Sequence, residues 1–418
     1  MTDEEIKGLF ADKIPLFDGA FGTYVQKINP DVKDYAGYPG LNEMLSVSRP
    51  DIVLRIHGEY FAAGADFAET DTFGANAAVL SEYGIQSRVR ELNLAAAGIA
   101  AAAARRFSSA GRRRYAAGSV GPTNRSVYVT GGISFDEMRN VYEEQISALY
   151  DGGVDLILFE TAHDALNLKA GLAAARSVFR KKGRRLPVVV SATMDVHDKM
   201  LSGHDPAAFY AAVEHYPLAA VGFNCSGGPE TMGKRLAELR RISRFPVFVM
   251  PNAGMPDENG NYSGTPEKFA EVTAGYAAAG LADAVGGCCG TLPAHIKALA
   301  ERTAGLKPSF SAAPRIWTVS GVEAVFLGAE PLMVGERNNS IGSKAFRDKV
   351  SAADWDGAVS ITKEQAAAGA RMASLSLCLI TSSMNPAISV ISASLKPRVV
   401  TAGVPMRMPL VTIGGSGS

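Results

Sequence analysis

The chain has 418 residues, of which 47% are hydrophobic and 20% charged, and its 42 basic residues balance 42 acidic ones. This length allows one large domain with part of another, or two to three ordinary domains, and the charge balance argues against nucleic-acid and polybasic membrane surfaces. No stretch approaches 18 consecutive apolar residues and the acidic start MTDEEIKGLF lacks a signal-peptide core, so we expect a cytoplasmic protein with no nucleic-acid or membrane partner.

Eight short runs rich in β-branched and aromatic residues recur along the first 300 positions, at 13–19, 65–74, 115–122, 154–161, 186–193, 218–225, 245–254 and 281–290. Segments with helical periodicity separate them. One of these is 134–153, whose apolar residues recur three to five positions apart and which ends at two glycines. This alternation predicts parallel βα units. Eight units within residues 1–305 favour an α/β fold of the (β/α)₈ TIM-barrel type over an open doubly wound sheet.

A second region follows the expected barrel. Residues 306–329 contain proline, glycine and serine of linker type, and 330–372 read as a truncated second α/β segment that is too short for another barrel. From Met372 to Ser418 the chain has no Asp or Glu. We therefore expect the tail, 373–418, to be poorly ordered, as the result of a natural truncation or of a shifted reading frame.

Polar residues stand where the apolar runs stop, and in a barrel these strand ends meet on one face. They are Asp18, Glu69, Asp71, Glu160, Asn224, Cys225, Asn252, Cys288 and Cys289. The six histidines show no comparable placement, and we interpret them as incidental. The expected active face therefore carries carboxylates, amides and three of the four cysteines.

The three cysteines at strand ends suit a metal better than a disulfide. Cα atoms of neighbours such as Cys288 and Cys289 lie about 3.8 Å apart, closer than a disulfide prefers. The surrounding glycines let both thiolates point the same way, and Cys225 supplies a third. Three thiolates fit Zn²⁺ and leave a fourth position open. The alternative is that all three are small apolar core residues, which is how we interpret the isolated Cys378.

An open zinc position has two uses. The metal can acidify a water for hydrolysis, or it can bind a substrate thiol and remove its proton. Three thiolates place much negative charge around the ion, which weakens its pull on water and leaves a fourth sulfur electron-rich. We therefore favour thiol activation followed by transfer to sulfur.

Several motifs, taken together, resemble the homocysteine methyltransferase domain of cobalamin-dependent methionine synthases. They are FDGAFGTYVQK (17–27), ETDTFGAN (69–76), GSVGPTN (118–124), ISFDEM (133–138), GGVDLILFET (152–161), LSGHDP (201–206), GFNCSGGPE (222–230), MPNAG (250–254) and GGCCGTLPAHI (286–296). They occur in the family's order across about 300 residues. The segment GERNNSIGSKAF (335–346) is similar to the opening of the pterin-binding domain that follows in that family.

The resemblance implies a zinc ion held by Cys225, Cys288 and Cys289, with homocysteine sulfur as the substrate ligand. Asn252 matches an asparagine that fills the fourth position while substrate is absent. The amino-acid end of homocysteine is assigned to Asp18, Gly19, Glu160 and Thr161. We add Asn224, at a strand end, as a further candidate for substrate binding. These residue types suit the two charged groups of an amino acid. Its ammonium group pairs with carboxylates, and its carboxylate is bound well by N–H groups at glycine turns.

The resulting hypothesis is methyl transfer to zinc-activated homocysteine, giving methionine. The donor would be methylcobalamin presented by a cobalamin-binding domain or protein, since the chain resembles a fragment of a larger enzyme. It carries no Asp-x-His-x-x-Gly cobalamin signature, and after Met372 it departs from the family's acidic strand, which argues against folate binding. Two alternatives remain: a related methyltransferase with a sulfonium or betaine-type donor, and a homocysteine sensor without turnover.

Overall fold

The computed structural model describes residues 1–258, 260, 262–328, 333–340, 342–370, 372–375 and 400–403. The chain divides into two compact units, Met1–Arg315 and Ile316–Ser418, and each is described by itself. The division lies within the segment 306–329. Cys378 and most of the acid-free tail lie outside the described residues.

The first unit is built on one parallel sheet whose seven strands follow the order of the sequence. Each strand pairs with the next in parallel register, for example Val221 of one strand with Val247 of its neighbour. Every strand falls inside one of the expected apolar runs, except that β3 extends one residue beyond its run, to Ala162. The strands are β1 (Phe67–Glu69), β2 (Tyr115–Val120), β3 (Leu156–Ala162), β4 (Val188–Ala192), β5 (Ala220–Asn224), β6 (Val247–Met250) and β7 (Ala284–Val285).

The run at 13–19 closes the sheet into a barrel without forming a full strand. Its Phe17 N–H donates to the carbonyl of Val285 in β7 (2.9 Å), while the carbonyl of Leu16 accepts from Phe67 in β1 (3.1 Å). Pro15 has no N–H to extend this pairing, and the segment is a single bridge between Leu16 and Val285. The predicted TIM-barrel fold is thus confirmed, with a short eighth stave between the last strand and the first.

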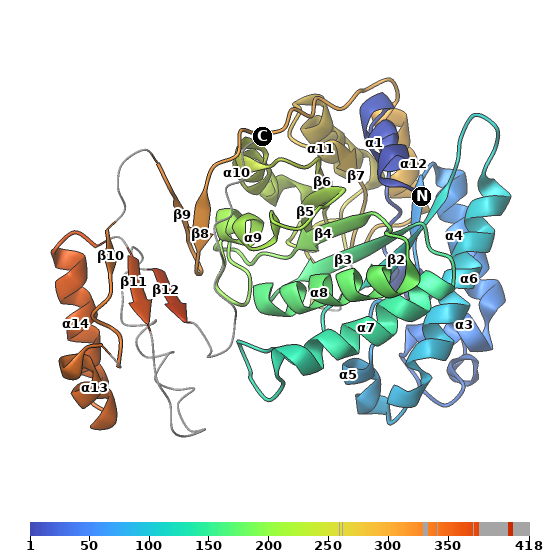
Figure 1. Ribbon diagram of the computed structural model, residues 1–418. Coiled ribbons are helices and arrows are strands. Elements are labelled where there is room, and N and C mark those ends of the chain that lie inside the picture. The colour runs from blue at the N-terminus through green and yellow to red at the C-terminus, as the bar shows by residue number, and fades with distance from the viewer. Residues whose placement is uncertain are drawn as a thin grey trace. The chain divides into compact units, whose positions relative to one another are not determined.

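Helices cover the outside of the sheet (Figure 1). In the expected helix at 134–153, Ser134 and Glu137 form a reciprocal capping box, and the helix ends at Gly152. The helices of the first unit are α1 (Asp3–Asp12), α2 (Phe21–Ile28), α3 (Leu45–Ser48), α4 (Pro50–Ala63), α5 (Ala77–Leu80), α6 (Val89–Phe107), α7 (Phe135–Asp151), α8 (Ala165–Lys182), α9 (Pro206–Val213), α10 (Gly233–Ile242), α11 (Pro266–Ala278) and α12 (Pro293–Thr303).

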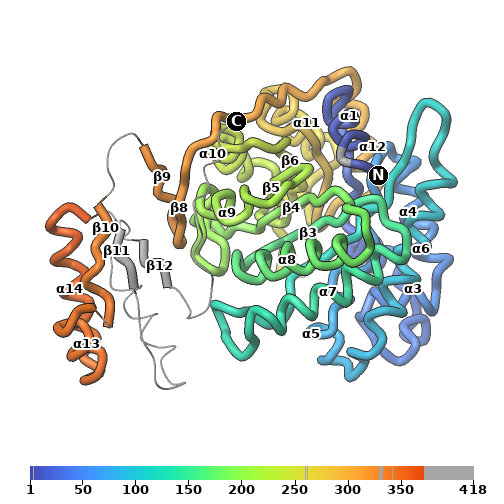
Figure 2. Tube along the Cα trace, viewed as in Figure 1, coloured from blue at the N-terminus to red at the C-terminus, as the bar shows by residue number. Residues whose placement is uncertain are grey.

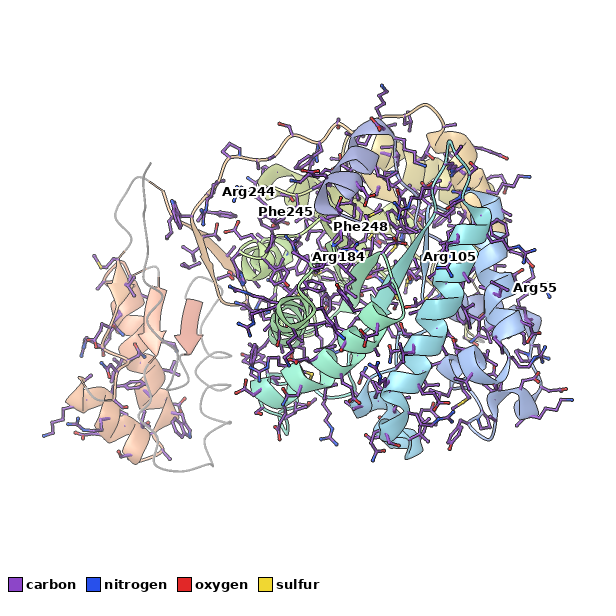
Figure 3. The ribbon with its side chains drawn as sticks, turned by 45° about the vertical axis from the view of Figure 1, so that its right-hand side comes forward. Arg55, Arg105, Arg184, Arg244, Phe245 and Phe248 are labelled. Atoms are coloured by element: carbon purple, nitrogen blue, oxygen red, sulfur yellow. The ribbon has the colours of Figure 1, made fainter. Side chains whose placement is uncertain are left out.

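The ring of helices also closes. The last helix, α12, lies beside α4, the first of the large outer helices (Figure 2). Ile296 of α12 packs into one buried cluster with Ile56 and Tyr60 of α4. The outer faces carry the charged residues: Arg55 and Arg105 are exposed on their helices, whereas Phe248 of β6 is fully buried (Figure 3). The pattern explains why the strands read as continuous apolar runs, since both of their faces are covered.

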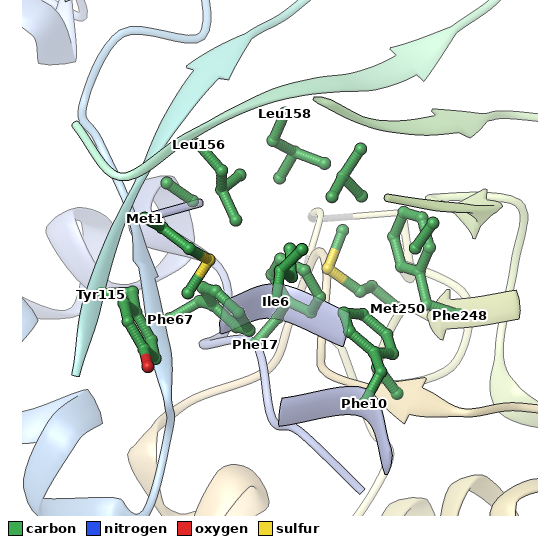
Figure 4. Close-up of a cluster of buried hydrophobic side chains, with 14 residues drawn as sticks. Met1, Ile6, Phe10, Phe17, Phe67, Tyr115, Leu156, Leu158, Phe248 and Met250 are labelled. Carbon is green, nitrogen blue, oxygen red and sulfur yellow. The ribbon is translucent and has the colours of Figure 1, made fainter. Parts of the chain in front are cut away.

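The barrel interior is filled from the amino-terminal end of the strands. Phe17, Phe67 and Phe248 stack on one another within it. Met1, Ile6 and Phe10, at and near α1, pack against the same cluster (Figure 4). Burying each such side chain contributes about 1.5–3 kcal/mol. With this end plugged by apolar groups, the polar residues at the carboxyl ends are left to form the site.

The second unit contains a two-stranded antiparallel sheet and a three-stranded parallel one. The first pairs β8 (Thr318–Ser320) with β9 (Ala324–Phe326), and the second has the order β10 (Val334–Gly335), β11 (Met372–Leu375) and β12 (Val400–Gly403). Two helices, α13 (Lys344–Ser351) and α14 (Trp355–Ala367), pack through a small core around Phe346. Two of these strands thus include residues of the tail that we expected to be poorly ordered.

Among the residues that the structure describes, no helix has the length and apolar character that crossing a membrane requires.

Candidate active site

The three cysteines expected at strand ends come together in the first unit. Cys225 follows β5, and Cys288 and Cys289 follow β7. The Sγ atoms of Cys225 and Cys289 lie 3.5 Å apart. All three Sγ atoms lie within 4.8 Å of one another. No disulfide joins them, because all three are free thiols.

Backbone pairing beyond the strands holds this arrangement. The Cys225 N–H donates to the Met250 carbonyl (3.3 Å) and the Cys288 N–H to the Pro251 carbonyl (2.8 Å). Cys225 has φ of 51°, a left-handed conformation that a side chain rarely adopts. Gly287 has no room for a Cβ, which would lie 2.5 Å from Thr291 Oγ1. The strained cysteine and the closely packed glycine are typical of a functional site.

The sulfur atoms interact strongly. Hydrogen bonds from Cys225 and Cys288 hold the pKa of Cys289 at about 3, so this sulfur is a thiolate. The pKa of Cys288 is raised well above its usual range by its contacts with Cys225 and Cys289 and by burial. Three sulfurs in such close contact form a place where a cation would be favoured over thiol protons.

The donor set fits a zinc ion. Two sulfurs bound tetrahedrally at about 2.3 Å from one zinc lie about 3.8 Å apart, and the separation of Cys225 and Cys289 is close to that value. Asn252 supplies a further observation: its Oδ1 atom is buried and has no hydrogen-bond partner among the described residues. Its backbone N–H is held by the Gly227 carbonyl at 2.9 Å. An orphaned amide oxygen is a suitable fourth ligand.

The sulfurs face a cavity of about 270 Å³ at the carboxyl ends of the strands. Of the expected site residues, those that line it are Gly19, Glu160, Thr161, Cys225, Cys288 and Cys289. Asp18, Asn224 and Asn252 are buried but do not line it. The three buried residues therefore act from behind the cavity wall.

A group of buried carboxyls forms the acidic side of the cavity. Asp18 accepts the Glu69 N–H at 3.0 Å, and Ser119 Oγ donates to Glu160. Burial and the charge of Glu160 raise the pKa of Glu69 well above its usual range, while burial raises that of Glu160 to about 7. Glu69 is therefore the protonated member and Glu160 the readily ionised one. Such a group attracts a cation from solution.

Thr161 is held beside Glu160 in a strained conformation, with φ of 55°. The Asn224 side chain fixes it from both sides: Oδ1 accepts the Thr161 N–H and Nδ2 donates to Thr161 Oγ1, both at 2.8 Å. Ser191 Oγ also donates to Asn224 Oδ1 at 2.8 Å, and Asn224 Nδ2 lies 3.7 Å from Cys288 Sγ. Asn224 thus links the threonine to the sulfur cluster.

Sequence reasoning missed several residues of the site. Ser119 partners Glu160, and Glu43 lines the cavity with Asp71, whose pKa is raised well above its usual range by burial and by the charge of Glu43. The ring of Tyr262, in the loop after β6, packs against Gly290, the residue that follows Cys289. Ser119 lies within the run at 115–122 and could have been found from its place near a strand end. Glu43 lies in a short 3-10 helix, Asn42–Met44, and Tyr262 in a loop, and neither carries such a signal.

The three converging sulfurs and the buried carboxyls place the candidate active site at the carboxyl face of a TIM barrel. Residues 15–303 match the model of the homocysteine S-methyltransferase family, and the chain belongs to this family. It is 37% identical over 385 residues to methionine synthase of Mycobacterium tuberculosis and 36% identical over 396 residues to that of Mycobacterium leprae. These matches take in 91% and 90% of the chain, but only 32% of each relative.

Solved structures agree on the fold. The homocysteine methyltransferase MmuM from Escherichia coli, in its oxidised form, superposes with a TM-score of 0.59 at 24% identity, covering 72% of this chain and all of that one. Its metallated form gives a TM-score of 0.57 and covers 71% of this chain and 98% of that one. The family match confirms the resemblance to homocysteine methyltransferases that the motifs indicated.

Proposed function

We propose that the first unit transfers a methyl group to the sulfur of homocysteine, held on a zinc ion by Cys225, Cys288 and Cys289, and so makes methionine. The observation that carries the proposal is the convergence of these three sulfurs, all within 4.8 Å, on one acidic cavity. Zinc, when bound there, would lower the pKa of the substrate thiol and keep its sulfur nucleophilic near neutral pH.

The remaining residues bind and orient the substrate. Glu160 lines the cavity beside the sulfurs, and its carboxylate would pair with the α-ammonium group of the substrate. Gly19 and the first residues of α2 also line the cavity, where unpaired N–H groups of a helix start suit an α-carboxylate. Asp18 acts on Glu69, and Asn224 on Thr161, so both are proposed to position substrate-binding groups. A substrate that is fixed at both ends presents its sulfur to one place.

The donor is proposed to be methylcobalamin carried by another domain or protein. The exposed large hydrophobic side chains among the described residues of the first unit lie outside its strands, on loops and short helical segments. They are Val32, Val47, Phe73, Tyr83, Tyr128, Val129, Val196, Leu201 and Met255. Of these, Phe73 lines the cavity. An exposed apolar side chain at the cavity favours a partner that docks there.

The test is zinc analysis of the purified chain followed by incubation with homocysteine and free methylcobalamin. Methionine formation that depends on zinc supports the proposal. A zinc-loaded chain that binds homocysteine but forms no methionine with any donor would point instead to the sensor. Turnover with a sulfonium or betaine-type donor, and none with methylcobalamin, would identify the other methyltransferase class.

A further inference from the structure

Arg235, near the start of α10, is a charged residue buried behind the cysteine cluster. Only 3% of its surface is exposed, and arginine is almost never buried to this extent without partners. Its guanidinium group has three of them. Nη1 donates to the Ser226 carbonyl at 3.0 Å, and Nη2 to the Asp195 carbonyl at 2.7 Å. Nε donates to the Asp198 carboxylate at 2.5 Å. One side chain therefore joins α10 to two loops at the carboxyl face.

The first of these loops contains Cys225. Ser226, whose carbonyl accepts from Arg235, is the next residue in the chain. Cys225 has φ of 51°, and such a conformation persists only where the surrounding structure holds it. On the amino side, the Cys225 N–H is bonded to the Met250 carbonyl at 3.3 Å. On the carboxyl side, Arg235 fixes the peptide group that follows Ser226. The two bonds bracket the strained cysteine and so determine where its sulfur points.

The second loop, between β4 and α9, is bonded to the same turn. The Met194 N–H donates to Ser226 Oγ at 2.8 Å. Thr193 Oγ1 donates to the Cys225 carbonyl at 3.1 Å. The loop therefore supports the cysteine turn directly, and a change in its conformation would reach Cys225.

Arg235 also fixes the conformation of this second loop. Asp198 has φ of 59°, again in the left-handed region, and its carboxylate pairs with both Arg235 and Lys234. The Asp198 N–H donates to the Asp195 carbonyl at 3.2 Å, the same carbonyl that accepts from Arg235. Loss of the guanidinium group would thus release the cysteine turn and the loop that supports it together.

We propose that Arg235 is a positioning residue for the zinc site, which holds the Cys225 turn so that its sulfur faces those of Cys288 and Cys289. The proposal rests on the proposed function, because it treats the three sulfurs as metal ligands. Arg235 does not line the cavity, and it acts through the backbone of Ser226. A planar guanidinium group suits this role, because its donors point in fixed directions.

The same helix supplies a matched control. Arg240 pairs with the Asp283 carboxylate at 2.8 Å and donates to the Ser309 carbonyl at 2.7 Å. Asp283 directly precedes β7, so these bonds lie at the amino-terminal end of the barrel, opposite the cysteines. Removing Arg240 should destabilise the chain at least as much as removing Arg235, because Asp283 is fully buried and Asp198 is partly exposed.

The test measures the zinc affinity of the full chain by competition with a chelator. Arg235→Met and Arg240→Met each keep an unbranched side chain and lose every hydrogen-bond donor. We expect Arg235→Met to bind zinc about 10–100-fold more weakly, the usual effect of removing a group that orients a metal ligand. Arg240→Met should keep the wild-type affinity. Urea unfolding of both variants compares their stabilities.

Binding of Co²⁺ gives a second readout, because its visible absorption depends on the number and the arrangement of the sulfurs around the ion. The Co²⁺ spectrum should change in Arg235→Met and stay the same in Arg240→Met. A general loss of stability would not produce this difference between two variants of one helix.

Arg235→Lys separates position from charge. Lysine keeps the positive charge and can pair with Asp198, but its single ammonium group lacks the planar fork that reaches two carbonyls and a carboxylate together. We therefore expect its zinc affinity to be about ten-fold below that of the wild type. Full recovery in Arg235→Lys would overturn the proposal, because the charge alone would then suffice. This milder variant also provides the test if Arg235→Met does not fold.

Failure of this proposal and failure of the proposed function give different results. A wild-type zinc affinity and Co²⁺ spectrum in Arg235→Met would overturn the positioning role and leave the zinc site in place. Equal losses of affinity in Arg235→Met and Arg240→Met would overturn it as well, because the effect would then follow stability. A wild-type chain that binds neither metal would contradict the proposed function, and the positioning role with it.

Discussion

The Sγ atoms of Cys225 and Cys289 lie 3.5 Å apart although 64 residues separate them in the sequence. This distance is far longer than the roughly 2.05 Å of a disulfide bond and close to the spacing of two sulfurs on one zinc ion. The barrel produces it by bringing the ends of β5 and β7 to either side of β6. The fold thus builds a metal-binding geometry from residues whose sequence positions are unrelated.

The first prediction concerns this cluster. The purified chain should hold about one zinc ion, and changing Cys225, Cys288 or Cys289 to alanine should each remove most of it, because two thiolates bind far more weakly than three. Atomic absorption measures the metal. Circular dichroism should change little, since the barrel has its own apolar core. Full zinc retention in all three variants would show that the site is misassigned.

A second prediction follows from Glu160, whose pKa is raised to about 7 by burial. Ionisation of this carboxyl as pH rises should strengthen the binding of an α-ammonium group. Norleucine has this group but no sulfur, so its affinity isolates the effect. We expect the affinity to increase up to about ten-fold between about pH 6 and pH 8, measured by calorimetry.

The matched variant is Glu160→Gln, which should lose this pH dependence. It should also weaken homocysteine binding by about 1–3 kcal/mol, the scale of a hydrogen bond to a charged group, without changing the zinc content. If Glu160→Gln kept the full pH dependence, another group would be responsible.

A third prediction concerns stability. The folded pKa of Glu69 is raised well above its unfolded value by burial and by the charges of Glu160 and Asp18. Between these two pKa values the folded chain binds more protons than the unfolded chain, so the free energy of unfolding falls as pH rises. Glu69→Gln should therefore stabilise the chain at pH 8, by about 1–3 kcal/mol. The gain should shrink as pH falls below about 4, where the carboxyl is mostly protonated in both states. Urea unfolding at both pH values measures it, and a variant less stable than the wild type at pH 8 would contradict the argument.

The barrel was predictable from sequence because its strands are buried on both faces and its helices on one. The seven strands therefore appear as apolar runs, and α7 shows its period and its capping residues. The opening stave was harder, since a segment containing Pro15 closes the barrel with one bridge rather than a ladder. The convergence of the cysteines followed from topology alone, because parallel strand ends meet on one face.

What could not be predicted depends on how loops fold over the strand ends. We expected Asn224, from its place at a strand end, to bind substrate, yet it lies behind Thr161 and orients it. The Tyr262 ring packs against Gly290, a contact that only the three-dimensional structure shows. Local patterns identify which residues reach the active face. They do not tell which of these residues touch the cavity.

A fourth prediction tests the barrel packing at Gly222 in β5. A Cβ there would lie 2.0 Å from the Phe248 carbonyl oxygen of the paired strand β6. Gly222→Ala should therefore destabilise the chain by about 3 kcal/mol or more. Gly98→Ala is the control, because Gly98 is exposed in the interior of α6 with nothing within 4 Å of an added Cβ. That variant should stabilise the chain by about 0.5–1 kcal/mol. Urea unfolding that gives both variants the same sign would refute this packing argument.

The last prediction separates the two compact units. Limited proteolysis should cut the chain after about residue 305, within the linker segment, and leave an amino-terminal piece near Met1–Arg315 that keeps its zinc. The reason is that the sheet, its closing stave and all three cysteines belong to that unit. The piece should use free methylcobalamin about as well as the whole chain. A methyl-transfer assay on both preparations, matched for zinc, makes the comparison.

The same proteolysis experiment also tests the second unit. Its described residues form a three-stranded parallel sheet and a two-stranded antiparallel one, instead of the eight parallel strands that close a barrel, so we expect no protease-resistant folate-binding fragment from it. Recovery of a stable carboxyl-terminal fragment that binds methyltetrahydrofolate would contradict this expectation. Loss of zinc from the amino-terminal piece would contradict the expectation that this piece holds the complete metal site, because the site would then depend on residues beyond Arg315. The two results are independent, since the first is measured by folate binding and the second by metal content.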